Sequence, residues 1–219
     1  MVGLLLFSFV ILFSLGLFYF SQERKQILQQ KFEELHAISN SKINQLVEFH
    51  KSHFRFLNYI SGTVSISRSS IDVNFLLKSL YEQFSKASVS KEISLKLNLK
   101  VPGSLALVNT DEDKVLTILS ELLGNSFKFT KEGVIELGNY IEGDKLFFYV
   151  NDTGCGIDSA KIESLFNYFE VINVKLTRKH SGVGLGLPIA KSYVEVLGGA
   201  LNISSEIGKY TSVHFWIPL

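Results

Sequence analysis

The chain has few of the residues that cross-link or interrupt a fold. Its 219 residues include one cysteine, Cys155, and three prolines, of which the first is Pro102. A single cysteine excludes a disulfide within the chain and permits a reducing compartment. Cys155 is interpreted either as a small filler residue or as a nucleophile, and the lack of a nearby histidine in the sequence favours the filler.

An excess of charge of either sign is also missing. The formal net charge is +1, since 22 Lys and Arg residues face 21 Asp and Glu residues. This balance argues against the basic composition of a nucleic-acid-binding protein and against an acidic tail. We therefore expect no nucleic-acid partner.

The first twenty residues contain no charged side chain and are mostly Leu, Phe, Val and Ile. As a helix they would span about 30 Å, the thickness of the hydrocarbon core of a bilayer. A cleaved signal peptide is the alternative, but no basic residue precedes the apolar run and no Ala-x-Ala-like site follows it. Residues 1–20 are thus predicted to be a transmembrane helix in contact with lipid. Arg24 and Lys25 follow it, which predicts a single-pass membrane protein with the remainder in the cytoplasm.

Residues 21–66 are predicted to form a helical stem. Seven positions fall on alternating steps of three and four residues: Ile43, Leu46, His50, His53, Leu57, Ile60 and Val64. This heptad spacing favours a coiled coil, and we expect a homodimer or heterodimer through the stem. His50 and His53 are interpreted as partly buried residues of the seam or as phosphate acceptors, because imidazole is a nucleophile at neutral pH.

Residues 70–219 mix helical and strand patterns. Apolar side chains recur every three or four residues in 72–84, after 112 and again after 186, which predicts helices. Alternating or apolar runs predict strands at 93–99, 134–140, 145–150, 201–205 and 211–217.

The helix that starts near Thr110 carries three polar residues on one face. Glu121 and Asn125 are four residues apart, and Lys128 follows three residues later. A solvated helix face is one explanation. The other is a site for Mg²⁺ and a triphosphate, with Asn125 as an oxygen ligand, Lys128 against phosphate and Glu121 orienting water or a hydroxyl.

An Asp-x-Gly-x-Gly segment follows the strand predicted at 145–150. Gly154 and Gly156 lack the Cβ atoms that would block a ligand, and an ionised Asp152 can only accept hydrogen bonds. A carboxylate repels phosphate but holds a base with an exocyclic amine, so Asp152 favours the adenine end of a nucleotide. An ordinary hairpin turn is the alternative for so short a motif.

The polar segment 167–181 is typical of a lid or a disordered loop. It ends in Gly182, Gly184 and Gly186, which open an apolar helix. Glycines at a helix N-terminus expose N–H groups to an anion, and the helix dipole favours one. The spacing of these glycines, with no strand before them, differs from that of a Rossmann loop.

Five motifs, taken in order, resemble those of the sensor histidine kinases. Residues 121–130 resemble the N box, 152–156 the first glycine box, 166–169 the F box, 182–187 the second glycine box and 205–211 the last one. Residues 70–219 thus resemble the catalytic ATP-binding domain of this family, whose fold is shared with type II topoisomerases and MutL-type ATPases. The resemblance implies a two-layer α/β sandwich, in which helices cover one face of a mixed sheet.

Carried over position by position, the resemblance implies ATP and Mg²⁺ as cofactors. Asn125 would bind the metal, Lys128 a phosphate and Asp152 the adenine amine. The other implied contacts are Gly154 and Gly156 along the base, Gly182, Gly184 and Gly186 as lid hinges, and Thr211 beside the adenine. The implied function is that of a membrane-anchored protein histidine kinase of two-component signal transduction, with a response regulator or a partner kinase as partner.

Three departures from the family pattern keep a second function open. Glu121 stands where many sensor kinases carry another Asn, and in the hydrolysing relatives a Glu at this place activates water. Tyr210 replaces a glycine common in the last box. The phosphoacceptor box is missing, because none of His36, His50 and His53 is followed by an acid and a proline.

Two functions therefore stay open. One is a histidine kinase with Glu121 and Asn125 as catalytic residues and an unknown phosphoacceptor. The alternative is an ATP-binding or ATP-hydrolysing regulator, or a truncated or inactive kinase that lacks its own acceptor histidine.

Overall fold

The computed structural model describes residues 24–40, 42, 64–88, 92–167 and 184–219. Residues 1–20, His50, His53, Gly182 and most of the predicted stem lie outside these ranges. The chain divides into two units, Met1–His50 and Lys51–Leu219.

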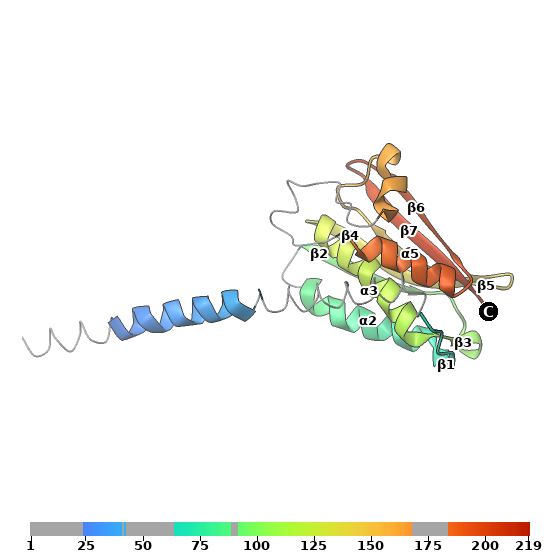
Figure 1. Ribbon diagram of the computed structural model, residues 1–219, viewed down its shortest axis with the longest axis horizontal. Coiled ribbons are helices and arrows are strands. Elements are labelled where there is room, and N and C mark those ends of the chain that lie inside the picture. Colours follow the sequence, from blue (N-terminus) through green and yellow to red (C-terminus); the bar gives the residue numbers. More distant parts are fainter. Residues whose placement is uncertain (1–23, 41, 43–63, 89–91, 168–183) are drawn as a thin grey trace, which may run out of the picture. The chain divides into compact units, whose positions relative to one another are not determined.

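In the first unit, residues 24–40 form a helix (Figure 1), and all of these residues are exposed. Within the described ranges, no helix combines the length and the apolar character needed to cross a bilayer. The helix of residues 24–40 is charged and shorter than the roughly 20 apolar residues that a bilayer requires. This finding contradicts the predicted single-pass membrane localisation, and residues 1–20, on which that prediction rested, are not among those described.

The second unit is a mixed α/β fold. Its strands are β1 (Ser69–Asp72), β2 (Ile93–Leu99), β3 (Leu107–Thr110), β4 (Gly133–Glu142), β5 (Lys145–Asp152), β6 (Ala200–Glu206) and β7 (Tyr210–Pro218). Its α-helices are α2 (Val73–Ser88), α3 (Glu112–Phe129) and α5 (Gly186–Val196), and short 3-10 turns lie at Gly103–Leu105, Ser159–Lys161 and Glu163–Phe166. The predicted α/β class is confirmed.

Two sheets organise these elements. Five strands pair in the order β2-β4-β5-β7-β6, in which only the β2–β4 pair is parallel among the described strands. The strands β1 and β3 form a small antiparallel sheet beside it. The three helices lie over one face of the larger sheet (Figure 1).

The core lies between this helical layer and the sheet. In β5, Leu146, Phe148 and Val150 are buried and alternate with side chains of the open face, as the two-residue period of a strand requires. Phe148 stacks on Phe215 of β7, with 4.9 Å between ring centroids. The apolar face of α3 packs on these side chains, which brings the predicted N-box residues close to the ends of β5 and β7.

The N-cap of α3 is Asp111, whose carboxylate accepts the backbone N–H of Lys114 at 3.0 Å. The preceding residue, Thr110, also has a side-chain oxygen of the kind that caps helices. Thr110 instead ends β3, where it pairs with Ser69. The next residue with a side-chain acceptor therefore caps the helix.

Candidate functional site

Asp152 ends β5 with its side chain on the helical side of the sheet, and only 6% of the residue is exposed. Its Oδ2 accepts the hydroxyl of Ser126 on α3 at 2.8 Å, and its Oδ1 accepts the backbone N–H of Gly154 at 2.9 Å. Burial raises the pKa of the Asp152 carboxyl, and the hydrogen bonds from Ser126, Gly154 and Thr130 oppose that rise. An ionised carboxylate has about four lone-pair sites, so Asp152 keeps the capacity to accept a ligand amine.

Thr211, on β7, lies directly opposite Asp152 in the sheet register. Its hydroxyl is 3.1 Å from that of Ser205, which also donates to the carbonyl of Tyr210 at 2.6 Å. A serine hydroxyl has one proton, so Thr211 is the donor toward Ser205. Ser205 also accepts the N–H of Ile157 at 2.8 Å, which ties the glycine loop to β6 and β7.

The two glycines of this loop lie where backbone segments approach closely. A Cβ on Gly154 would lie 2.7 Å from Oδ1 of Asp152 and 2.8 Å from the carbonyl oxygen of Phe129. Gly156 has a φ of +65°, and a Cβ there would collide with the carbonyl of Glu206. Glycine is required at both positions, since a side chain would push the loop away from Asp152 or from the β6–β7 turn.

The second cluster joins α3 to the N-terminus of α5. A Cβ on Gly186 would lie 2.5 Å from Oε2 of Glu121 and 3.9 Å from Nδ2 of Asn125. No side-chain hydrogen bond caps α5 in the described structure. The N-terminus of α5, where the helix dipole favours an anion, thus lies beside Glu121 and Asn125. Gly184, with a φ of +71°, precedes this helix.

Lys128 lies in the last turn of α3, one turn after Asn125. Burial lowers the pKa of its ammonium, which lies 5.1 Å from the centroid of the Phe129 ring. Helix periodicity places Lys128 on the same side as Asn125. The predicted residues thus form two groups, one at the ends of β5 and β7 and one between α3 and α5.

Two polar residues beside Asp152 were not predicted from the sequence as site residues. They are Ser126 and Thr130. Ser126 follows Leu119, Leu122 and Leu123 at helical spacing, so it had to face the core, where a hydroxyl needs a partner. The Thr130 hydroxyl is buried beside the Asp152 carboxylate, and its interaction with that carboxylate acts to lower the Asp152 pKa. It lies 2.8 Å from the position of a Gly154 Cβ, so it offers hydrogen bonding to a ligand held at Asp152.

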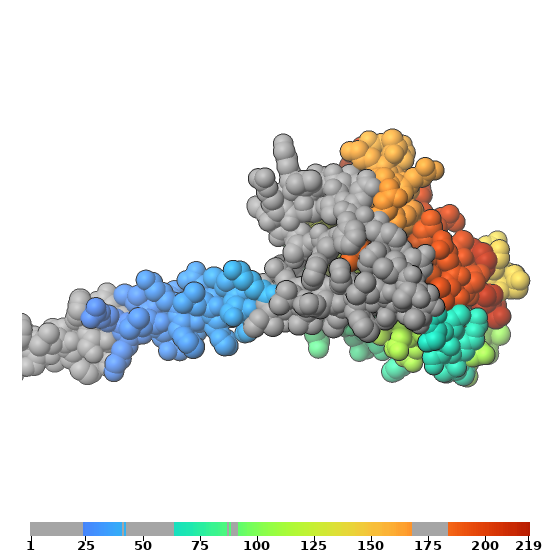
Figure 2. Space-filling model, viewed as in Figure 1, coloured from blue at the N-terminus to red at the C-terminus, as the bar shows by residue number. Residues whose placement is uncertain are grey.

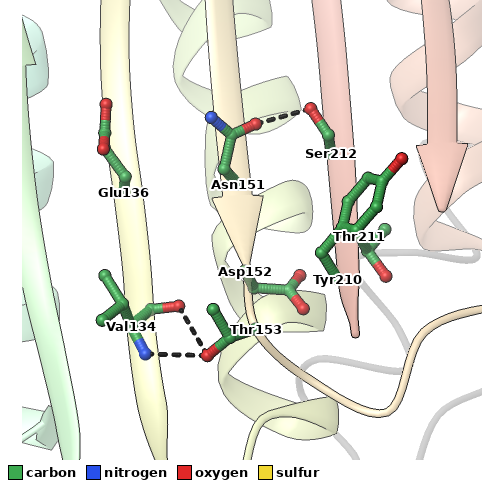
Figure 3. A pocket seen from close by; sticks show the side chains of 8 residues that line it. All are labelled: Val134, Glu136, Asn151, Asp152, Thr153, Tyr210, Thr211 and Ser212. Atoms are coloured by element: carbon green, nitrogen blue, oxygen red, sulfur yellow. Dashed lines mark hydrogen bonds between the residues drawn. The ribbon is translucent and has the colours of Figure 1, made fainter. Parts of the chain in front are cut away.

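A hollow of about 410 Å³ lies over the ends of β4, β5 and β7 (Figure 3). It is lined by Val134, Glu136, Asn151, Asp152, Thr153, Tyr210, Thr211 and Ser212. Glu136, Asn151 and Ser212 are register partners that alternate with buried neighbours, so they face away from the helices. Asp152 and Thr211 also line the hollow, so it adjoins the predicted nucleotide site at the ends of β5 and β7.

A family model described as "Histidine kinase-, DNA gyrase B-, and HSP90-like ATPase" matches residues 110–219. The chain belongs to this family. The circadian input-output histidine kinase CikA of Synechococcus elongatus is 36% identical over 128 residues, which cover 58% of this chain and 17% of that protein. The autoinducer 2 sensor kinase/phosphatase LuxQ of Vibrio vulnificus is 30% identical over 183 residues, which cover 81% of this chain and 20% of that protein.

Among solved structures, full-length ShkA in complex with AMPPNP matches with a TM-score of 0.70 at 26% identity, covering 79% of this chain and 35% of that one. The assignment to the histidine kinases and their ATPase fold is confirmed by the family match and by the named relatives. The chain spans a fifth or less of the length of the two curated relatives. The roles of the individual site residues remain predictions.

Proposed function

We propose that this chain is the ATP-binding and phosphotransfer part of a two-component histidine kinase. The observation that carries the proposal is the buried Asp152 carboxylate, which Ser126 and the Gly154 N–H hold in place and which keeps the capacity to accept a further hydrogen bond. A buried carboxylate is costly to desolvate, and a ligand that donates a further hydrogen bond to it offsets part of that cost.

At the adenine end, Asp152 accepts the exocyclic amine of ATP. Thr211 flanks it from β7, and the backbone of Gly154 and Gly156 leaves room for the flat base. The hydrogen bonds from Ser126 and Gly154 keep the carboxylate in place before the ligand arrives, so little side-chain entropy is lost on binding.

At the phosphate end, the N–H groups at the start of α5 and the ammonium of Lys128 attract the phosphates. Among the described residues no group of three or more His, Cys, Asp or Glu side chains could hold a metal. A nucleotide-bound Mg²⁺ needs only one or two protein oxygens besides phosphate, and the amide of Asn125 beside Gly186 fits that need. When bound, Mg²⁺ neutralises charge on the phosphates.

The proposed reaction transfers the γ-phosphoryl group to a histidine nitrogen and leaves ADP. The described His36 lies on the exposed helix of residues 24–40 and is followed by Ala37, not by an acid. His50 and His53 lie outside the described residues. We therefore propose that a partner kinase, joined to this chain as a heterodimer, supplies the acceptor histidine, and that a response regulator takes up the phosphoryl group; a homodimer would offer only the histidines of this sequence.

ATP hydrolysis is the second candidate function. The observation that favours it is the Glu121 carboxylate against the N-terminus of α5, at the phosphate end of the site. A carboxylate there is placed to orient water toward the γ-phosphate.

Calorimetry with ATP and Mg²⁺ tests the proposal. The parent chain should bind, and Asp152→Asn should weaken binding by roughly 1–3 kcal/mol because an amide cannot match the amine in the same way. A parent chain that does not bind ATP, or an Asp152→Asn variant that binds equally well, would refute the site assignment.

Release of phosphate separates the two functions. If Glu121 orients water, Glu121→Gln should abolish phosphate release while ATP still binds. An acid-labile phosphoryl label on histidine, formed only when a partner chain is present, favours the kinase.

A further inference from the structure

Asp111 and Lys114 form a buried ion pair at the start of α3. Their charged groups are 2.7 Å apart, and the side chains are 4% and 11% exposed. The Lys114 ammonium also donates to the carbonyl oxygen of Ser65 at 2.6 Å, and the Asp111 carboxylate accepts the N–H of Ser67 at 2.8 Å. We call Ser65, Ser67, Asp111 and Lys114 the entry clamp, because they hold the segment that leads into β1.

Both charged groups of the entry clamp, the Asp111 carboxylate and the Lys114 ammonium, form hydrogen bonds. Burial acts to raise the pKa of Asp111, but the hydrogen bonds from Lys114 and from the Ser67 N–H outweigh it and hold the pKa below its ordinary value. A buried ion pair is stable only when such additional hydrogen bonds satisfy it. In the space-filling view, the segment around β1 (teal) forms part of the surface of the second unit (Figure 2).

Lys114 also reaches α5. Its ammonium lies 5.7 Å from the centroid of the Tyr193 ring, within the range of a cation–π contact. Lys114 is seven residues before Glu121 on α3, and Gly186 is seven residues before Tyr193 on α5. Seven residues are about two helical turns, or roughly 10 Å.

The two helices are therefore joined at two matched points. Lys114 meets Tyr193 at one end, and Glu121 meets Gly186 at the other. Because a helix is stiff over two turns, a shift of α5 at Gly186 also changes the position of Tyr193 against Lys114. The entry clamp thus lies at the far end of the helix pair that forms the phosphate end of the site.

We propose that Asp111 and Lys114 are positioning residues that couple segment 65–67 to the nucleotide site, an inference that rests on the proposed function. A nucleotide between Gly186 and Asn125 holds α5 against α3 and tightens the entry clamp. By linkage, opening the clamp weakens nucleotide binding by the same factor by which the nucleotide tightens the clamp. The segment that enters the domain can thereby regulate the site.

The exchange of the Ser67 amide proton reports on the clamp directly, since this N–H is bonded to Asp111. Hydrogen exchange of the full chain is followed with and without a non-hydrolysable ATP analogue and Mg²⁺. We expect the analogue to slow exchange at Ser67 by about fivefold or more, the lower range of coupling between sites. A parent chain that binds the analogue with no change at Ser67 overturns the coupling and leaves the proposed function intact. A parent chain that does not bind the analogue refutes both.

Two variants and a control test whether the coupling runs through Asp111, Lys114 and Tyr193. Tyr193→Leu keeps the ion pair but removes the ring beside Lys114, and it should reduce the protection of Ser67 and the affinity for the analogue by a common factor. Asp111→Asn combined with Lys114→Met removes both charges together and keeps a capping oxygen for α3, and it should have the same two effects. Lys78→Met makes the same lysine change on the exposed face of α2 and should change neither. Parent-like affinity in both test variants would overturn the proposal.

Discussion

Ser126 on α3 donates its hydroxyl to Asp152 at the end of β5, across 2.8 Å and 26 residues of sequence. This hydrogen bond links the N box to the first glycine box. It holds a carboxylate that is buried, and it does so from a helix that also carries Asn125 and Lys128. One serine thus sets the position of the adenine end relative to the phosphate end.

Ser126→Ala should weaken ATP binding by about 1 kcal/mol, or roughly fivefold, because Asp152 loses a hydrogen-bond donor in a buried environment. Calorimetry on the parent and the variant measures the change. Ser192→Ala is the matched control, since it removes another buried hydroxyl that donates to the carbonyl of Ile189 at 2.9 Å and not to Asp152. Equal affinities for the two variants would mean that Ser126 does not support the site.

The affinity for ATP should fall as the solution is acidified. The pKa of Asp152 is raised by burial, so its carboxylate takes up a proton at a higher pH than the ordinary value of 3.8. The protonated group is a poorer acceptor for an amine, so binding weakens as the pH falls through the raised pKa. The unliganded domain responds in the opposite sense, because an acid with a raised folded-state pKa favours the folded state as the pH falls. Titrations from pH 8 to pH 4 should show the loss of affinity in the parent and a smaller one in Asp152→Asn.

Gly156→Ala should destabilise the domain more than Gly143→Ala. Both glycines have positive φ values, +65° and +62°, so both substitutions add backbone strain of about 1 kcal/mol. A Cβ at Gly143 meets nothing within 4 Å, whereas one at Gly156 collides with the carbonyl of Glu206. Denaturant unfolding measures the difference in unfolding free energy between the two variants. Because the backbone strain is common to both, this difference reports the cost of the steric clash between the loop and the β6–β7 turn. Equal losses would show that the loop relaxes without cost.

Asn139→Ala should reduce the free energy of unfolding by about 2–4 kcal/mol, because it removes the partner of the buried Val101 N–H and of the Asn74 side-chain oxygen. Asn139 is fully buried on β4. Its side chain accepts the N–H groups of Lys100 and Val101 at 3.2 and 3.4 Å and donates to Asn74 at 2.8 Å. Asn202→Ala, at an exposed position of β6, is the control and should change stability by under about 0.5 kcal/mol.

Local patterns in the sequence were sufficient for most of the secondary structure. The strand predicted at 93–99 coincides with β2, and the two runs at 134–140 and 145–150 lie within β4 and β5. These elements could be predicted because the alternation of buried and exposed side chains is written directly in the order of residues. The strands β1 and β3 were not predicted. Each has only four residues, without a regular alternation of polar and apolar side chains, and each becomes a strand only by pairing with the other.

The sequence by itself determined the family and the residue types of the site, because the motif glycines, Asp152 and Asn125 stand at spacings that local backbone geometry requires. Only the tertiary structure decided which groups meet. Asp152 lies opposite Thr211 and against Ser126, Gly186 lies against Glu121, and Lys114 binds Ser65. Each of these contacts joins segments at least 26 residues apart, and no local pattern encodes them. They follow from the order in which the strands pair and from the packing of α3 and α5 on the sheet.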